Sequence, residues 1–146
     1  RTDGVEVPVS VIARPEGANM IRLQAATTSG DAKEALEWKP AAFSDKEAAL
    51  GVAVVAIAGH TSTRGAQGII TGTSPSVKDT QPLYVETDIP TDSFAAGSPL
   101  IDAEGNIIAI ATRESRNLTT SSFLASSQII LQNKDTEEGG GITTAP

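Results

Sequence analysis

Short apolar segments separated by turn residues are the feature of this sequence that most restricts its fold. The segment "VEVPVSVIA" (5–13) has valine at every second position, which is the period of a half-buried strand. After a turn, "MIRLQA" (20–25) alternates in the same way. Because both segments are short and close in the chain, they predict a strand hairpin.

Five further candidate strands follow, and the turns between them carry Gly, Pro, Asp or Asn. They are residues 51–59, 66–74, 82–89, 106–115 and 121–131. The first of them, "GVAVVAIAG", is continuously apolar, which predicts a strand that is buried on both faces. Several short strands at this spacing predict an all-β sandwich or barrel.

The remaining segments predict the domain organisation. Residues 29–50 are charged and Ala-rich with Pro40 among them, which predicts a connector with at most a helical turn or two. Residues 132–146 have a glycine triplet and no apolar pattern, which is typical of a flexible tail or linker. We therefore expect a hairpin over residues 1–28, the connector, and a barrel over residues 51–131.

Composition restricts the possible functions. The net charge of −7, without a basic cluster, argues against a nucleic-acid partner and against binding to an anionic membrane surface. The chain lacks cysteine, and none of its apolar runs reaches the roughly 18 residues of a membrane helix. The single histidine, His60, has no second ligand at metal-binding spacing. We therefore expect no metal, no cofactor and no insertion into a membrane.

The segment "TDSFAAGSPLIDAEGNIIAIAT" (91–112) has the frame of the nucleophile loop of a serine protease. A Gly-rich turn is followed by Pro-Leu and then by a hairpin. At the position of the nucleophilic serine stands Ala96, whose methyl group has no nucleophilic atom.

In these segments the chain resembles the trypsin-like serine proteases, and most closely the bacterial HtrA/DegP-type members. Residues 86–112 are similar without a gap to the nucleophile region of that family, and "SSFLASSQII" is similar to its GFAIPS block. Four blocks in the family's order cover about residues 1–131. The resemblance implies an all-β fold: a six-stranded antiparallel barrel, with an incomplete first barrel at the N-terminus.

The resemblance also assigns the catalytic positions, and none carries its catalytic residue. The serine position is Ala96, and the aspartate position is Asn19, whose amide favours the wrong imidazole tautomer. The family's histidine lies upstream of the matched region, and His60 stands at a proline position. In the family's GNSGG motif, Phe94 replaces the first glycine, which disturbs the oxyanion hole, and Ser98 replaces the last. These changes indicate natural degeneration rather than an engineered serine-to-alanine trap.

Two functions without catalysis remain open. In the first, the domain binds a protein or an extended peptide along an exposed strand at residues 108–113. The expected binding residues are Phe94, Ala96, Gly97, Ser98, Ile110, Ala111 and Thr112. In the second, the barrel is a structural part of a larger assembly, and Phe94 fills the old cleft.

A third function, an active serine hydrolase, would require a shifted nucleophile such as Ser93 or Ser98 with an adjacent base, and the chain offers no second histidine. The resemblance further implies a bacterial protein outside the cytoplasm, periplasmic or secreted. Since the N-terminal hairpin cannot close a barrel alone, we expect another chain or an upstream segment to complete it.

Overall fold

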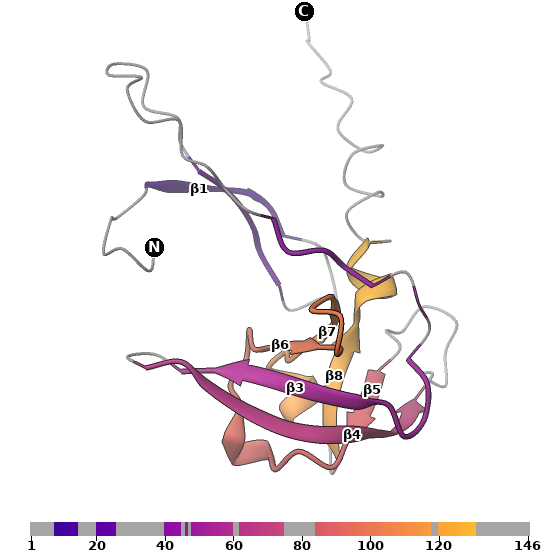
Figure 1. Cartoon of the computed structure of the whole chain (residues 1–146). Helices are drawn as coiled ribbons and strands as arrows, with labels where there is room; N and C mark the ends of the chain where they lie inside the picture. The colour runs from indigo at the N-terminus through magenta and orange to yellow at the C-terminus, as the bar shows by residue number, and fades with distance from the viewer. Residues whose placement is uncertain are drawn as a thin grey trace, which may run out of the picture. The chain divides into compact units, whose positions relative to one another are not determined.

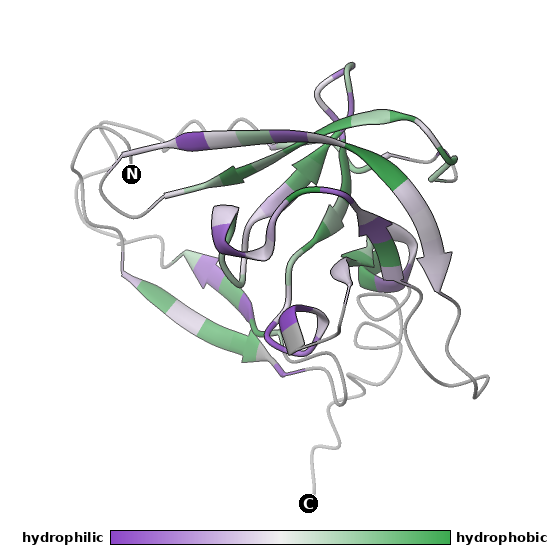
Figure 2. Ribbon diagram, turned by 90° about the horizontal axis from the view of Figure 1, so that it is seen from below, coloured by the Kyte–Doolittle hydropathy of each residue, from purple (hydrophilic) through white to green (hydrophobic). Residues whose placement is uncertain are grey.

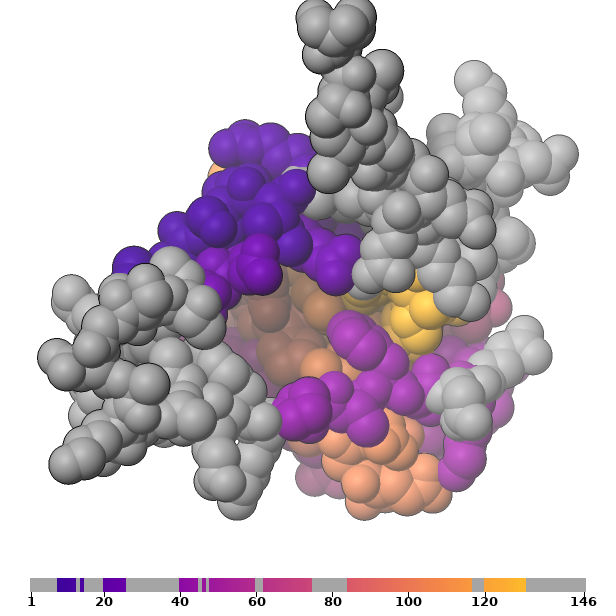
Figure 3. All heavy atoms as spheres, turned by 90° about the horizontal axis from the view of Figure 1, so that it is seen from above, coloured from indigo at the N-terminus to yellow at the C-terminus, as the bar shows by residue number. Residues whose placement is uncertain are grey.

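Strands make up most of the part of the chain that the structure describes (Figure 1). The structure is a computed structural model and describes residues 8–14, 20–25, 40–44, 46, 48–59, 62–74, 84–117 and 120–130. The atoms of the remaining residues are grey in Figure 3. The strands are β1 (Val9–Ala13), β2 (Arg22–Ala25), β3 (Ala53–Ala58), β4 (Arg64–Ser74), β5 (Tyr84–Thr87), β6 (Pro99–Ile101), β7 (Ile107–Ile110) and β8 (Ser121–Ala125). The 3-10 helices are η1 (Thr91–Ser93) and η2 (Ser115–Asn117).

The chain divides into two compact units, Arg1–Pro40 and Ala41–Pro146, and each is described by itself. In the first unit, β1 and β2 form an antiparallel sheet of two strands, in which Val9 pairs with Ala25. Its apolar side chains are not buried, since Val9 and Leu23 are 53% and 49% exposed. The hairpin predicted from the alternating valines is therefore present.

The second unit contains a closed barrel with the strand order β3-β4-β5-β8-β7-β6. All of its strand pairs are antiparallel, and closure gives each strand a neighbour on both sides. Figure 2 shows hydrophobic residues, in green, recurring along the strands. Every strand contributes to the core, through Val54, Ala56, Ile70, Val85, Leu100, Ala109 and Phe123. The predicted all-β fold with a six-stranded antiparallel barrel is confirmed.

Strand β3 differs from its prediction. Val54 and Ala56 are buried, with 1% and 0% exposure, but Val55 and Ile57 are partly exposed. The expectation that this segment is buried on both faces was wrong. An antiparallel barrel of this size presents one face of each strand to the core and leaves the other towards its surroundings.

The barrel unit begins earlier in the chain than the sequence predicted. The N–H of Ile107 donates to the carbonyl of Ala42 at 2.8 Å, and the N–H of Ser44 donates to the carbonyl of Ile107 at 2.8 Å. Phe43 thereby forms a parallel bridge to Ile107. Part of the segment 29–50, which we expected to be only a connector, is thus hydrogen-bonded to β7.

The last predicted strand is shorter than expected. β8 ends at Ala125, and residues 126–130 are α-helical. Ser126 and Ile129 are both buried and lie three residues apart, which is a spacing of one helix face. The hydroxyl of Ser126 donates to the carbonyl of Ser44 at 3.3 Å, so the start of this helix is bonded to the barrel unit.

Candidate functional site

The loop between β5 and β6 carries Ala96, the residue that the resemblance places at the serine position. Pro90 starts the 3-10 turn η1, in which the N–H of Ser93 donates to the carbonyl of Pro90 at 2.9 Å. Phe94 is then extended, and a tight turn over residues 95–98 leads into β6. Gly97 has a φ of 92°, a conformation that glycine adopts without strain.

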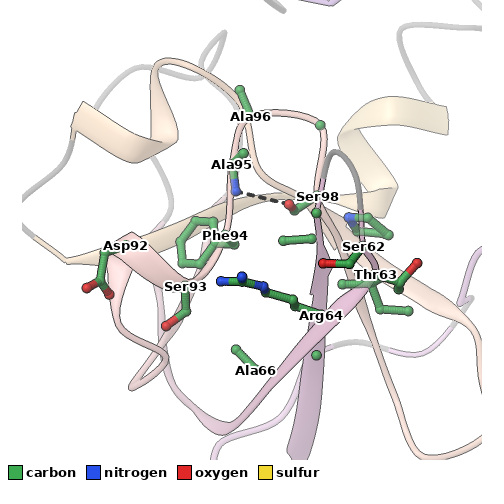
Figure 4. Close-up of a pocket in the computed structure, with 16 residues that line it drawn as sticks. Ser62, Thr63, Arg64, Ala66, Asp92, Ser93, Phe94, Ala95, Ala96 and Ser98 are labelled. Carbon is green, nitrogen blue, oxygen red and sulfur yellow. Dashed lines mark hydrogen bonds between the residues drawn. The ribbon is translucent and has the colours of Figure 1, made fainter.

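The turn is held by two hydrogen bonds between the same residues. The N–H of Ser98 donates to the carbonyl of Ala95 at 3.0 Å, and the N–H of Ala95 donates to Oγ of Ser98 at 3.1 Å (Figure 4). Ser98 is buried. The side chain that replaces the last glycine of the GNSGG motif therefore fixes the shape of this turn.

Ala96 lies exposed at the tip of the turn, and its methyl group is the only side-chain group at the nucleophile position (Figure 4). The other two sequence candidates, Asn19 and His60, lie outside the described residues. The described part of the chain also lacks a cluster of three His, Cys, Asp or Glu side chains that would hold a metal ion.

Phe94 turns into the core. It is 3% exposed, and its ring centroid lies 4.4 Å from that of Phe123, with 34° between the ring planes. The guanidinium of Arg116 lies over the Phe94 ring, 5.9 Å from the ring centroid. Arg116 also donates to the carbonyl of Thr91 at 3.2 Å. Phe94 was expected to line a shallow binding pocket, but its ring is mainly a core side chain.

The strand expected to bind an extended peptide is already paired. β7 lies between β6 and β8. Beyond its end, the N–H of Ala111 donates to the carbonyl of Ser98 at 2.9 Å, and its carbonyl accepts the N–H of Gly97 at 2.7 Å. The prediction of an open edge from residue 108 to residue 112 was wrong. β7 is paired with both β6 and β8, the turn before β6 binds the backbone of Ala111, and Ser115 accepts the N–H of Thr112.

Sequence reasoning also missed what fixes this end of β7. The N–H of Thr112 donates to Oγ of Ser115 at 2.8 Å, and the N–H of Ser115 donates to Oγ1 of Thr112 at 3.0 Å. Both side chains are buried. The spacing of a Thr and a Ser three residues apart in a loop was the available signal for such a reciprocal turn.

A pocket of about 890 Å³ lies on the other side of the loop (Figure 4). Because β6 lies between β3 and β7, the turn before β6 has Ala111 on one side and the ends of β3 and β4 on the other. The residues that line the pocket are Ile57, Ala58, Gly59, Ser62, Thr63, Arg64, Gly65, Ala66, Asp92, Ser93, Phe94, Ala95, Ala96, Gly97, Ser98 and Pro99.

The pocket gathers only part of the predicted binding residues. Phe94, Ala96, Gly97 and Ser98 line it, whereas Ile110, Ala111 and Thr112 do not. Those three residues are instead held in or beside the barrel ladder. Arg64, which the sequence did not single out, is the cationic residue of the pocket lining.

A closed six-stranded antiparallel barrel, with a tight turn at residues 95–98 that leads into a Pro-Leu strand, is typical of the trypsin-like class of fold. The family model described as the trypsin-like peptidase domain matches residues 1–110 of the 146. The chain belongs to the trypsin-like peptidase family, as the sequence predicted. The comparison with curated proteins gave no match.

Solved structures show the same fold. An HtrA-type protease, AlgW, in complex with a decapeptide has a TM-score of 0.68 and 18% identity, covering 94% of this chain and 43% of AlgW. An inactive serine-to-alanine mutant of Rv3671c from M. tuberculosis has a TM-score of 0.63 and 16% identity, covering 93% of this chain and 68% of that one. Deg5 has a TM-score of 0.63 and 16% identity, with coverages of 86% and 58%. This chain thus spans between 43% and 68% of the length of these structures.

Proposed function

We propose that this chain is a proteolytically inactive, trypsin-like domain that serves as a structural and scaffolding module. The observation that carries the proposal is the inward position of Phe94, stacked on Phe123 beside a serine position that holds Ala96. A loop that is packed into the core suits a structural role better than catalysis, because catalysis requires the loop to receive a substrate.

The nearby hydroxyl groups do not replace the missing serine. Oγ of Ser98 is buried and accepts the N–H of Ala95, so it is engaged in the turn. Ser93 lines the pocket, but the sequence has a single histidine, His60, which stands at a proline position of the family and not at that of the base. These observations support inactivity.

As its partners we propose other polypeptide segments that cover the β1–β2 hairpin. A hairpin of two strands is marginally stable in water by itself, and Val9, Val11 and Leu23 leave apolar surface exposed. Strands from another chain or another segment would bury these side chains and complete a first barrel. A chain that lacks the hairpin but keeps Ala41–Pro146 should then lose the partner without losing the barrel.

We propose a bacterial location outside the cytoplasm, periplasmic or secreted, which is supported by the likeness of the fold to HtrA-type proteases. Within the described residues, no helix has the length and apolar character needed to cross a membrane.

Labelling with a fluorophosphonate probe tests the proposed inactivity. The unmodified chain should remain unlabelled under conditions in which an active trypsin-like protease is labelled stoichiometrically, and it should not degrade casein. Stoichiometric labelling of the unmodified chain would overturn the proposal.

A further inference from the structure

We infer that the pocket beside the 95–98 turn binds the free C-terminal carboxylate of a polypeptide, and that Arg64 is its anion-binding residue. With a volume of about 890 Å³, the pocket is in the size range of sites that hold small molecules or the end of a peptide. The inference stands independently of whether the barrel hydrolyses peptides.

Arg64 is available for a ligand. It is the first residue of β4, it is exposed, and Figure 4 shows its side chain reaching across the pocket towards Ser93 and Phe94. In the described part of the chain, no carboxylate lies within ion-pair distance of its guanidinium. A guanidinium presents parallel N–H donors that match the two oxygens of a carboxylate.

The charges of the pocket favour a singly charged anion over a doubly charged one. The chain carries a net charge of −7, which repels polyanions at long range. Inside the pocket, Arg64 supplies one positive charge and Asp92 one negative charge. This balance disfavours a doubly charged phosphate, but one guanidinium is sufficient for one carboxylate.

The rest of the lining fits the end of a peptide. Ser62, Thr63 and Ser93 bring hydroxyl groups that can donate to a carboxylate or accept from a peptide N–H. Ala58 and Ala66 are small and partly buried, so they leave room for a small apolar side chain. We therefore expect a last residue such as valine or alanine.

The location of the pocket explains how a peptide can bind although β7 has no open edge. Gly97 and Ser98 are bonded to Ala111 on one side of the turn. The pocket opens on the side of β3 and β4, so a peptide end that enters there displaces none of these hydrogen bonds.

The experiment is a titration of the full chain, uniformly labelled with ¹⁵N, with acetyl-Ala-Ala-Val. The free acid should bind saturably and shift the amide signals of residues 62–66 and 92–98. Its C-terminal amide should bind about tenfold more weakly or worse, because it cannot form the charged pair with Arg64. Sodium acetate and inorganic phosphate, titrated separately, should both bind more weakly than the free acid.

Variants locate the site. Arg64→Gln should weaken binding of the free acid by about tenfold or more. Arg64→Lys should weaken it by less, because lysine keeps the positive charge but lacks the two parallel N–H donors of the guanidinium. The matched control is Arg113→Gln, which removes the same charge outside the pocket and should change the affinity by less than about twofold. Equal binding of acid and amide by the unmodified chain, or full affinity in Arg64→Gln, would overturn the inference. If acetate bound as tightly as the tripeptide, the inference that the ligand is a peptide would be wrong. If phosphate bound more tightly than the tripeptide, the inference that the site prefers a carboxylate would be wrong.

Discussion

The ring centroids of Phe94 and Phe123 lie 4.4 Å apart, and this contact joins the loop before β6 to strand β8. Phe94 is 3% exposed and Phe123 is 0% exposed, so the pair belongs to the core. The family motif has a glycine at the position of Phe94, and a glycine offers no side chain for this contact. The loop that carries Ala96 therefore contributes to folding in this chain.

Replacing Phe94 with alanine should destabilise the barrel by about 3–5 kcal/mol, because a buried aromatic side chain is lost and a cavity remains. Urea unfolding, followed by circular dichroism, measures the difference. Phe43→Ala is the matched control, since Phe43 is 39% exposed and should cost about 1 kcal/mol or less. Equal losses for the two variants would show that Phe94 is not a core residue in solution.

Ser98→Ala should lower the free energy of unfolding by about 1 kcal/mol, since Oγ no longer accepts the N–H of Ala95. The substitution leaves the backbone of the turn otherwise unchanged. Ser93→Ala serves as the comparison and should stay within about 0.5 kcal/mol. If both serine variants unfold at the same urea concentration as the unmodified chain, the side chain of Ser98 does not stabilise the turn.

Ala96→Ser should not restore hydrolysis. The variant regains a hydroxyl group at the nucleophile position, but the single histidine of the chain, His60, stands at a proline position of the family and not at that of the base. We expect no labelling by a fluorophosphonate probe. Labelling of Ala96→Ser, but not of the unmodified chain, would reveal that a base is present and that only the nucleophile has been lost.

Asp102 should make stability depend on pH. Burial acts to raise the pKa of its carboxyl. Hydrogen bonds from Asn106 and from the N–H of Glu104 lower this pKa, as does the positive charge of Lys46. Together they outweigh the effect of burial and hold the pKa of Asp102 below its ordinary value. The contribution of Asp102 to the stability of the fold is therefore complete at pH values above its unfolded pKa of about 3.9. This contribution is lost as the pH falls through the lower pKa of the folded state.

Asp102→Asn measures this effect, because the amide keeps an acceptor oxygen but cannot ionise. The unmodified chain should be the more stable of the two at neutral pH, and the difference should shrink as the pH falls below about 4. Urea unfolding at several pH values gives the comparison. A difference that is the same at every pH would contradict the role of the charge.

The barrel was predictable because its signals are local. Apolar patterns, together with turn residues between the segments, indicated every strand of the barrel except β6, whose three residues are too few for such a pattern. The position of Ala96 was predictable for a similar reason, since the turn and the Pro-Leu pair after it are contiguous in sequence. The end of β8 at Ala125 was harder to predict, because "SSQII" (126–130) supports a strand by composition and a helix by the spacing of Ser126 and Ile129.

The features of the site that sequence reasoning missed depend on contacts between distant segments. Whether Ala111 offers a free N–H is decided by Ser98, thirteen residues earlier, through a bond that no local pattern reveals. Likewise, Arg64 has no motif around it, and it enters the pocket because β4 begins opposite the loop before β6. The side chain of Phe94 points into the core because it packs against Phe123, and this contact between residues far apart in the chain cannot be predicted from a local sequence pattern.

The loop of residues 91–98 is attached to the barrel near its start, in its middle and near its end. Arg116 holds Thr91, Phe123 packs on Phe94, and Ala111 is bonded to Gly97 and Ser98. A segment fastened in this way has no low-energy local opening, so the hydrogen-bonded amide protons of Gly97 and Ser98 should exchange with solvent only when the whole barrel unfolds. Loop and barrel should then unfold as one cooperative unit, so the loop should show no opening of its own.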